Sequence, residues 1–573
     1  MIDFKDSIAK LLAEKLPELT EAEIKGMVEI PQDQKMGDYA FPCFRLAKIM
    51  HKAPQQIAAG LAEEIKDSPL FAKVEQVNAY LNMFISREEM SKDTVSEVLE
   101  QGDAFGRSDI GGGKKVIVEY SSPNIAKPFH IGHIRSTVIG NSLNKIYDAL
   151  GYDVFRINHL GDYGTQFGKM ICAYRHWGNK EDVEREPIKT LLGYYTKFHV
   201  EVEDHPELED EARAIFAALE KGEPEEVALW QWFRDESLKE FNRVYKMLDI
   251  SFDSYNGESF YSDKMPRFEQ ELEDKGLMVE SQGAMVVDLE PYKLGVALIK
   301  KSDGSSLYIT RDIAAAVYRK ETYNFYKNIY VVASQQSLHF QQLFKILELM
   351  GYEDCAHGCV HVPFGLVRLE AGTMSTRHGR VVFLEDVLNK AVEKTKEIIL
   401  EKNPNAENVD EIAHQVGIGA VVFNELSNNR IKDYVFKWDH VLNFDGETGP
   451  YVQYTHARCC SLLRKADAAD VAKAADPASI DFSYLTGDAA YDLVKLLYAF
   501  PGVIEQAGER YEPSLVARHI VDIAQSFNRF YHDEHIICDN ADERVAKLAL
   551  VTAAKTAIKN GLALLGIHAP ERM

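Results

Sequence analysis

The chain has 573 residues, more than one domain usually holds, which predicts roughly three or four domains; its 46% hydrophobic and 27% charged residues are typical of globular proteins. The formal net charge of −24 argues against non-specific nucleic-acid binding, so any RNA partner would need a local surface assembled by folding. No apolar run reaches the ~18 residues that span a bilayer, which excludes a membrane partner, and the odd number of seven cysteines indicates reduced thiols.

The first segment, residues 1–110, mixes helical and strand-like patterns and is interpreted as an α+β domain. Its opening residues predict an amphipathic helix with early acids and no continuous apolar core, which excludes a signal peptide and predicts a cytoplasmic location. Residues 74–85 predict either paired strands or one bent strand. Three consecutive glycines at 111–113 predict a flexible joint, so we place the first domain boundary there.

The stretch 116–142 predicts a strand, a loop and a helix in succession, with His130, Gly132 and His133 at the start of the helix. The first turn of a helix attracts phosphate through its unpaired N–H groups and its dipole. Gly132 leaves room for a nucleotide, and the two histidines can donate hydrogen bonds to phosphate oxygens. The tetrad alone is equally compatible with two structural histidines at an ordinary turn.

The predicted core runs from 111 to 375 and is interrupted by insertions near 170–230 and 257–305. An acidic stretch at 181–214 is interpreted as a solvated helical surface that faces away from any RNA.

Two later strand predictions also end in polar residues. Residues 307–309 are strand-like, and Asp312 is expected in the first turn of the following helix, where the dipole favours an acid. Residues 330–333 predict a buried strand that leads to Gln336. Ligands of open α/β sheets bind at the carboxyl ends of the strands, so we expect polar groups there to line a site.

Cysteine and histidine alternate at Cys355, His357, Cys359 and His361. Zinc sites use two closely spaced pairs that lie far apart in the chain, and a strand would place these four residues on one face of a core element. We therefore expect no zinc, and no other metal ligands are assigned.

The stretch at 121–137, SSPNIAKPFHIGHIRST, resembles the arginyl-tRNA synthetases, which are class I aminoacyl-tRNA synthetases with this HIGH signature. The resemblance covers nearly the whole chain, from GDYA at 37–40 through GDYGTQFG at 161–168 to APERM at 569–573. It implies a multidomain α/β protein with a Rossmann-type parallel-sheet core and helical insertions. The α+β domain would contact the D-loop at the tRNA elbow, and residues 376–573 would form a signature-loop junction and an all-α anticodon-binding domain.

The resemblance assigns catalysis to His130, His133, Lys127 and Arg377, and ATP binding to His130, Gly132, His133, Met374 and Ser375. The second signature of the family, KMSKS, lacks its usual second lysine here. Charge develops on the departing pyrophosphate, so Lys127, Arg377 or Arg380 must supply the cation that opposes it.

Arginine recognition requires carboxylates in the plane of the guanidinium and a flat aromatic wall. By resemblance, Glu119 and Asp312 bind the guanidinium and Tyr308 packs beside it. The remaining assignments for the amino acid are Asn124, Gln336 and His133. Read alone, Glu119 would be an edge-strand acid and Asp312 an ordinary first-turn acid.

The resemblance also implies tRNA contacts at Tyr80, Asn82, Tyr454, Tyr531 and Met573. Stacking of an aromatic ring on an unpaired base contributes ~1–3 kcal/mol. The three tyrosines are also compatible with packing in a core.

The implied activity is ligation of L-arginine to tRNA(Arg) through arginyl-adenylate, with ATP and Mg²⁺, by a monomer that transfers arginine to the 2′-hydroxyl of the terminal adenosine. Activation of arginine is expected to require bound tRNA. Two alternatives remain open: another class I synthetase or adenylate-forming ligase, and a non-catalytic tRNA-binding paralogue.

Overall fold

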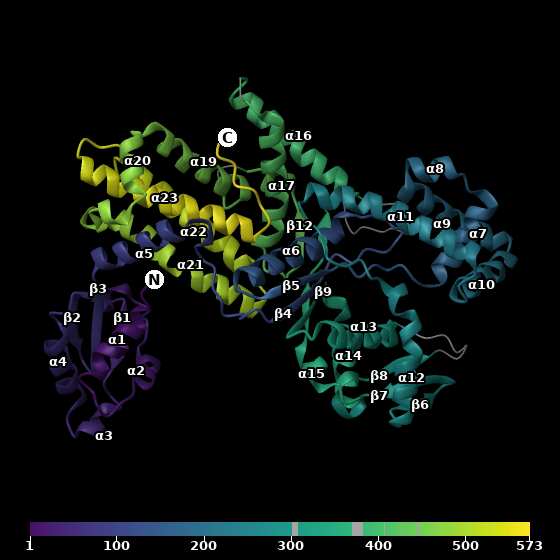
Figure 1. The fold of residues 1–573 in the computed structure, drawn as a ribbon, viewed down its shortest axis with the longest axis horizontal. Coiled ribbons are helices and arrows are strands. Elements are labelled where there is room, and N and C mark those ends of the chain that lie inside the picture. The colour runs from purple at the N-terminus through teal and green to yellow at the C-terminus, as the bar shows by residue number, and fades with distance from the viewer. Residues whose placement is uncertain (301–307, 370–381, 406, 444–445) are drawn as a thin grey trace.

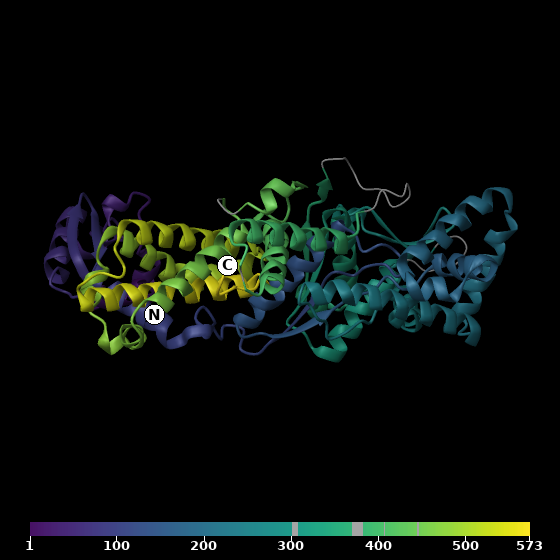
Figure 2. The ribbon, with the colours of Figure 1, turned by 90° about the horizontal axis from the view of Figure 1, so that it is seen from above.

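The computed structural model describes all of the chain except residues 301–307, 370–381, 406 and 444–445. The molecule is elongated: a small N-terminal unit and a group of insertion helices lie at opposite ends, and a parallel sheet lies between them (Figures 1 and 2). No helix in the described part of the chain combines the length and apolarity needed to cross a membrane.

The central sheet has four parallel strands in the order β10-β9-β4-β5. The strands are β4 (Lys115–Glu119), β5 (Asp153–Ile157), β9 (Lys327–Ala333) and β10 (Cys359–Phe364). The chain first adds β5 on one side of β4 and later adds β9 on the other side, so the strand order reverses between β4 and β9. Ligands of such sheets bind at the carboxyl edge of this switch point, where the residues that follow β4 and β9 meet.

Helix α6 (Ile134–Ala149) connects β4 to β5, and three more helices accompany the later strands: α13 (Tyr308–Tyr323), α14 (Ser337–Leu349) and α15 (Glu353–Gly358). Two sequence expectations are wrong here. Tyr308 begins α13 rather than ending a strand, and Asp312 consequently lies beyond the first turn of that helix. The Cys/His segment is helical until Gly358 and becomes a strand only at Cys359.

Both insertions into the core form secondary structure of their own, outside the central sheet. The first is helical, as the sequence predicted, and comprises α7 (Thr165–Trp177), α8 (Lys180–Arg185), α9 (Pro187–Asp204), α10 (Glu207–Glu220) and α11 (Pro224–Met247). The second contains α12 (Met265–Asp274) and an antiparallel sheet of β6 (Met278–Ser281), β7 (Ala284–Asp288) and β8 (Val296–Lys300).

The N-terminal unit is an antiparallel sheet, β1-β3-β2, covered by helices. Its elements are α1 (Phe4–Ala13), α2 (Glu21–Met27), β1 (Tyr39–Pro42), α3 (Leu46–Met50), α4 (Pro54–Ile65), β2 (Phe71–Val77) and β3 (Tyr80–Ile85). Strands β2 and β3 form a hairpin whose turn contains Asn78 at φ 54°, which decides between the two strand expectations in favour of paired strands.

The segment that follows this unit is packed firmly. Helix α5 (Arg87–Gln101) lies against the C-terminal helices α21 (Asp488–Arg510) and α23 (Ala541–Leu564). The N–H groups of Gly111 and Gly113 donate hydrogen bonds of 2.8 Å to the carbonyls of Leu150 and Gly151. The expectation of a flexible joint at the glycines is therefore wrong, because the run is fastened to the turn between α6 and β5.

Among its described residues, the C-terminal part is helical apart from one short strand. Its helices are α16 (Leu384–Lys402), α17 (Val409–Ser427), α18 (Trp438–Val441), α19 (Gly449–Lys465), α20 (Ala468–Ala474), α21 (Asp488–Arg510), α22 (Ser514–Asp533) and α23 (Ala541–Leu564). Strand β12 (Tyr434–Phe436) pairs in parallel with β11 (Val367–Leu369) and lies before the helices α19–α23 that end the chain. Three residues are too few for a strand period to show in the sequence.

A buried ion pair joins the first core helix to the C-terminal helices. Arg135 on α6 and Glu425 on α17 are both fully buried, with Nε of the arginine 3.5 Å from the carboxylate. Arg135 also donates hydrogen bonds to the carbonyls of Gly365 and Lys432, at 3.1 and 2.7 Å. The helix that follows the histidine tetrad is thereby fixed to the C-terminal part of the chain.

We predict that Arg135→Met lowers the apparent thermal unfolding midpoint substantially, because breaking a buried ion pair by removing one partner costs ~3–5 kcal/mol. The double variant Arg135→Met/Glu425→Leu, which removes both charges, should be more stable than the single variant. Differential scanning calorimetry at one scan rate measures both midpoints. A double variant no more stable than the single one would show that the charge pair is not the cause.

Candidate active site

The histidine tetrad lies at the carboxyl end of β4, where the chain turns into α6. His130 is followed by one 3₁₀ turn (Ile131–His133), and α6 begins at the next residue. The N–H of Ile131 donates to the carbonyl of Val382, and the N–H of Leu384 donates to the carbonyl of Phe129. The chain just beyond the second signature segment is thus bonded directly to the tetrad.

Two hydrogen bonds set the protonation state of the histidines. The N–H of Gly132 donates to Nδ1 of His130 at 3.0 Å, and the N–H of His130 donates to Nδ1 of His133 at 3.1 Å. Burial lowers the pKa of His130, and burial together with the neighbouring His130 lowers the pKa of His133 to about 3. Both rings are therefore neutral with Nδ1 accepting, so Nε2 carries the proton and is the donor available to a ligand.

Glu119, the last residue of β4, is paired with a buried arginine. Its carboxylate lies 2.6 Å from Nη1 of Arg319, which is fully buried on α13. The rings of Tyr261 and Tyr330 lie 5.8 and 5.7 Å from the Arg319 guanidinium. This cation holds the carboxylate of Glu119 in place at the switch point of the sheet.

Asp312 lies on the same helix as Arg319, seven residues earlier, and therefore on nearly the same face two turns away. Its carboxylate is 2.6 Å from Nε2 of His339 and remains 28% exposed. Burial lowers the pKa of His339, but the hydrogen bond that it donates to Asp312 outweighs burial, so the net effect is a raised pKa. The two predicted arginine-binding carboxylates thus belong to adjoining elements, β4 and α13.

More charges surround this position than the sequence indicated. The fully buried Asp162 accepts hydrogen bonds from the N–H and hydroxyl of Ser259, both at 2.9 Å, and lies 3.1 Å from Nε of Arg234. Glu258 lies 2.6 Å from Arg311, and burial raises the pKa of Glu258 to about 7. Acidic and basic side chains in this region are therefore paired with one another, and they come from several segments, among them α11, α13 and residues 257–260.

The other predicted ligand-binding residues divide into two groups. Asn124 and Gln336 are exposed beyond the ends of β4 and β9, and Lys127 is partly exposed in the loop before the tetrad. The side chain of Tyr308 lies outside the described part of the chain, as do all of Met374, Ser375, Arg377 and Arg380.

The N-terminal hairpin places its two predicted tRNA residues differently. Tyr80 is half-buried, whereas Asn82 is only 1% exposed, and its side-chain nitrogen has no hydrogen-bond partner in the structure. Phe44, which the sequence analysis did not select, is 54% exposed, and its ring meets that of Tyr80 edge-on at 5.4 Å.

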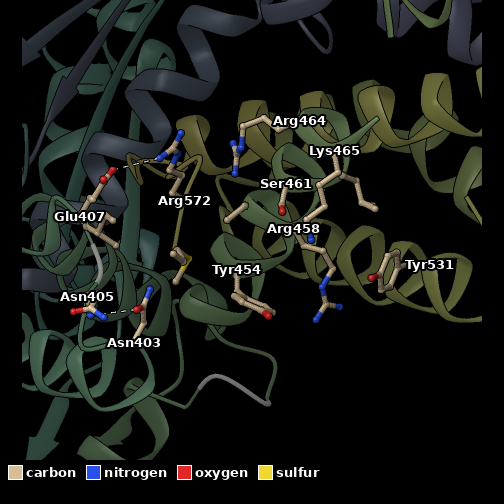
Figure 3. A pocket seen from close by; sticks show the side chains of 14 residues that line it. Asn403, Asn405, Glu407, Tyr454, Arg458, Ser461, Arg464, Lys465, Tyr531 and Arg572 are labelled. Atoms are coloured by element: carbon tan, nitrogen blue, oxygen red, sulfur yellow. Dashed lines mark hydrogen bonds and ion pairs between the residues drawn. The ribbon is translucent and has the colours of Figure 1, made fainter. Parts of the chain in front are cut away.

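The three C-terminal predictions gather in one cleft of about 680 Å³, shown in Figure 3. Tyr454 on α19 and Tyr531 on α22 are about 40% exposed, so the alternative that they are core residues is wrong. The guanidinium of Arg458 lies between them, 4.9 Å from the first ring and 5.3 Å from the second. Sequence reasoning missed Arg458, although its position one helical turn after Tyr454 placed it on the same face.

Comparisons with known proteins cover all three parts of the chain. Residues 94–438 match the family model described as "tRNA synthetases class I (R), catalytic domain". Residues 3–85 match the "Arginyl tRNA synthetase N terminal domain", and residues 452–573 match the "DALR anticodon binding domain".

Whole-chain relatives point the same way. The chain is 60% identical to the arginine–tRNA ligase of Clostridioides difficile and 56% identical to that of Halothermothrix orenii, with 100% of each chain covered in both comparisons. The solved structure of Thermus thermophilus arginyl-tRNA synthetase superposes with a TM-score of 0.79 at 25% identity, covering 99% of this chain and 100% of that one.

The lowered pKa of His133 predicts a pH-dependent contribution to stability. In the unfolded chain the imidazole binds a proton near pH 6.5, whereas the folded chain binds it only near pH 3. Between these values the unfolded state holds more protons, so stability falls as the pH is lowered, by up to ~1.4 kcal/mol per unit. His133→Asn should reduce this slope in midpoint-versus-pH curves; parallel curves for both proteins would contradict the buried neutral ring.

Proposed function

Since this chain belongs to the arginyl-tRNA synthetase family and is an arginine–tRNA ligase, we propose how its residues perform the two steps of that reaction. Two features support the proposal. Glu119, at the end of β4, is paired with Arg319 on α13, the helix that also carries Asp312, so two carboxylates suited to a guanidinium come from joined elements. His130 and His133, in the loop that follows β4, supply two neutral histidine donors.

In the first step the arginine carboxylate attacks the α-phosphate of ATP. The new bond joins a carboxylate oxygen to the α-phosphorus, and the bond from that phosphorus to the bridging oxygen of pyrophosphate breaks. ATP enters as its Mg²⁺ complex, so the metal arrives with the substrate. Gly132 leaves space for the nucleotide, and Nε2–H of His130 and His133 donates to phosphate oxygens, an interaction that strengthens as negative charge develops.

Substrate arginine is selected by charge and by shape. Asp312 and the oxygen of Glu119 that does not face Arg319 receive the guanidinium, while Tyr308 packs against its plane. Asn124, Gln336 and His133 hold the amino-acid end. A shorter or neutral side chain would leave these carboxylates unpaired, which is how such a site rejects other amino acids.

The cation that opposes pyrophosphate comes from the two segments that flank the tetrad. Lys127 precedes it, and Arg377 and Arg380 follow it in the second signature, where Met374 and Ser375 contribute to ATP binding. Val382, just beyond that signature, is bonded to Ile131, which supports the placement of both segments against the same phosphates.

The second step needs tRNA on a long path across the chain. We assign the elbow to residues 1–110 through Tyr80 and Asn82, the chemistry to 111–375, and the anticodon to 376–573 through Tyr454, Tyr531 and Met573. The 2′-hydroxyl of the terminal adenosine then attacks arginyl-adenylate and releases AMP. The enzyme acts as a cytoplasmic monomer and has no resident metal at this site.

We propose that activation of arginine requires bound tRNA, because the end of the chain is bonded to α6 and also lines the proposed anticodon cleft. Ser142 on α6 donates a hydrogen bond to the carbonyl of Leu564, at 2.9 Å. The tail that follows is held by bonds from α19: Gln453 donates to the carbonyl of His568 at 2.8 Å, and His456 to that of Pro570 at 2.9 Å. Arg572 and Met573 then line the cleft, so a ligand there acts on a tail that is bonded to the helix behind the tetrad.

The tRNA requirement is tested by pyrophosphate exchange with arginine and ATP, measured with and without tRNA. We expect exchange only when tRNA(Arg) is present. Exchange of equal rate in both reactions would retain the ligase and reject the requirement, whereas absence of exchange and of aminoacylation under both conditions would reject the catalytic assignment.

We predict that Asp312→Asn raises the KM for arginine by ~10–100-fold, the loss expected for a charge-assisted hydrogen bond, and changes the KM for ATP little. Asp312 is the better test of the pocket, because its carboxylate is partly exposed whereas Glu119 belongs to a buried pair. His339→Gln is the matched control: it removes the partner of Asp312 but keeps the carboxylate, so its KM should change much less. Equal effects of both substitutions would show that Asp312 acts only through His339.

A further inference from the structure

Two helices of the first insertion bring a cysteine, a histidine and a glutamate together, far from the proposed active site. Cys172 and His176 lie one turn apart on the same face of α7, and Glu211 lies on α10, which packs along α7. Figure 1 shows both helices at the end of the molecule opposite the N-terminal unit.

The geometry of the three side chains is close to that of a metal site. The thiol sulfur, one imidazole nitrogen and one carboxylate oxygen all lie within 4.8 Å of one another, and Nε2 of His176 is 3.0 Å from the carboxylate of Glu211. A tetrahedral Zn²⁺ with bonds of about 2.0–2.3 Å holds its ligand atoms roughly 3.3–3.7 Å apart. The three atoms need to move by only a few tenths of an ångström to about one ångström to reach this spacing.

The burial of Cys172 distinguishes this group of side chains from a simple surface ion pair. Cys172 is completely buried, whereas His176 and Glu211 are each 41% exposed. The buried thiol therefore lies beside a carboxylate, and a divalent cation would bind thiolate and carboxylate together.

We propose that Cys172, His176 and Glu211 form a Zn²⁺ site that cross-links α7 to α10. As the metal–sulfur bond forms, the Cys172 thiol releases its proton to solvent; with a neutral imidazole, the thiolate and the carboxylate then balance the two charges of the ion. Thiolate and imidazole ligands select zinc over Mg²⁺ or Ca²⁺, and water completes the fourth position on the exposed side. No spacing pattern in the sequence indicates this site, because Glu211 is distant in the chain from the other two ligands.

The experiment uses the full-length protein after treatment with a chelator, with Co²⁺ as the spectroscopic probe. We expect one equivalent of Co²⁺ to give a thiolate-to-cobalt charge-transfer band, which equimolar Zn²⁺ then removes. Cys172→Ser should abolish the band, and His176→Gln and Glu211→Gln, at partly exposed positions, should weaken Co²⁺ binding by about tenfold or more.

The same insertion supplies a matched control. His205 and Glu207 form an exposed pair of 3.1 Å in the same insertion, and no cysteine joins it in a three-ligand group of the described residues. His205→Gln should leave the band and its affinity unchanged. No band in the wild-type protein, a band that survives in Cys172→Ser, or an equal loss in His205→Gln would each overturn the proposal. Because aminoacylation is not the readout, failure here is separate from failure of the ligase assignment.

Discussion

Helix α6 is buried on nearly every side, and the arrangement of the other parts depends on this. All of its 16 residues except Lys145 and Asp148 are buried. One side packs on the sheet so closely that a Cβ at Gly140 would lie 2.2 Å from the Tyr120 side chain. Its other contacts are with α17, α21 and α23 from the C-terminal part. A helix in this position cannot shift without disturbing either the strand that precedes the tetrad or the C-terminal helices packed against it.

Buried charges impose a second constraint, because each must find a partner at a fixed place. Arg135 and Glu425 form an ion pair across the boundary between sheet and helices, and Arg319 pairs with Glu119 at the switch point. The second pair has a consequence for specificity: an internal guanidinium occupies one side of the very carboxylate proposed to receive a substrate guanidinium. The remaining oxygen of Glu119 is thereby oriented before any ligand arrives, which reduces the ordering that binding requires.

Most of the fold could be predicted from local sequence patterns, whereas the pairing of charged side chains that lie far apart in the chain could not. Buried apolar runs identified β4 and β9, and the helical character of the C-terminal part was evident. Tyr308 was misread because Leu-Tyr-Ile favours a strand locally, yet tertiary packing extends α13 back to that residue. The contact between Glu119 and Arg319 joins residues 200 positions apart, so no spacing rule reveals it. The cleft of Tyr454, Tyr531 and Met573 was reached only through the family resemblance, because each residue alone carries no signal for RNA.

The acidic composition and the tRNA substrate are reconciled by where the charges lie. Many of the acids occupy the insertion helices, at one end of the molecule, where α10 alone begins with Glu207, Glu209 and Asp210. The cleft, in contrast, is lined by four cations from α19 and the tail, Arg458, Arg464, Lys465 and Arg572, with a single acid, Glu407. These cations come from two segments that lie more than 100 residues apart in the chain, so no basic stripe exists in the linear sequence. The net charge of the chain determines the electrostatic field far from its surface. A bound phosphate or base instead responds to charged groups within about one Debye length of ~8 Å. Within that range the charged side chains of the cleft are mostly basic.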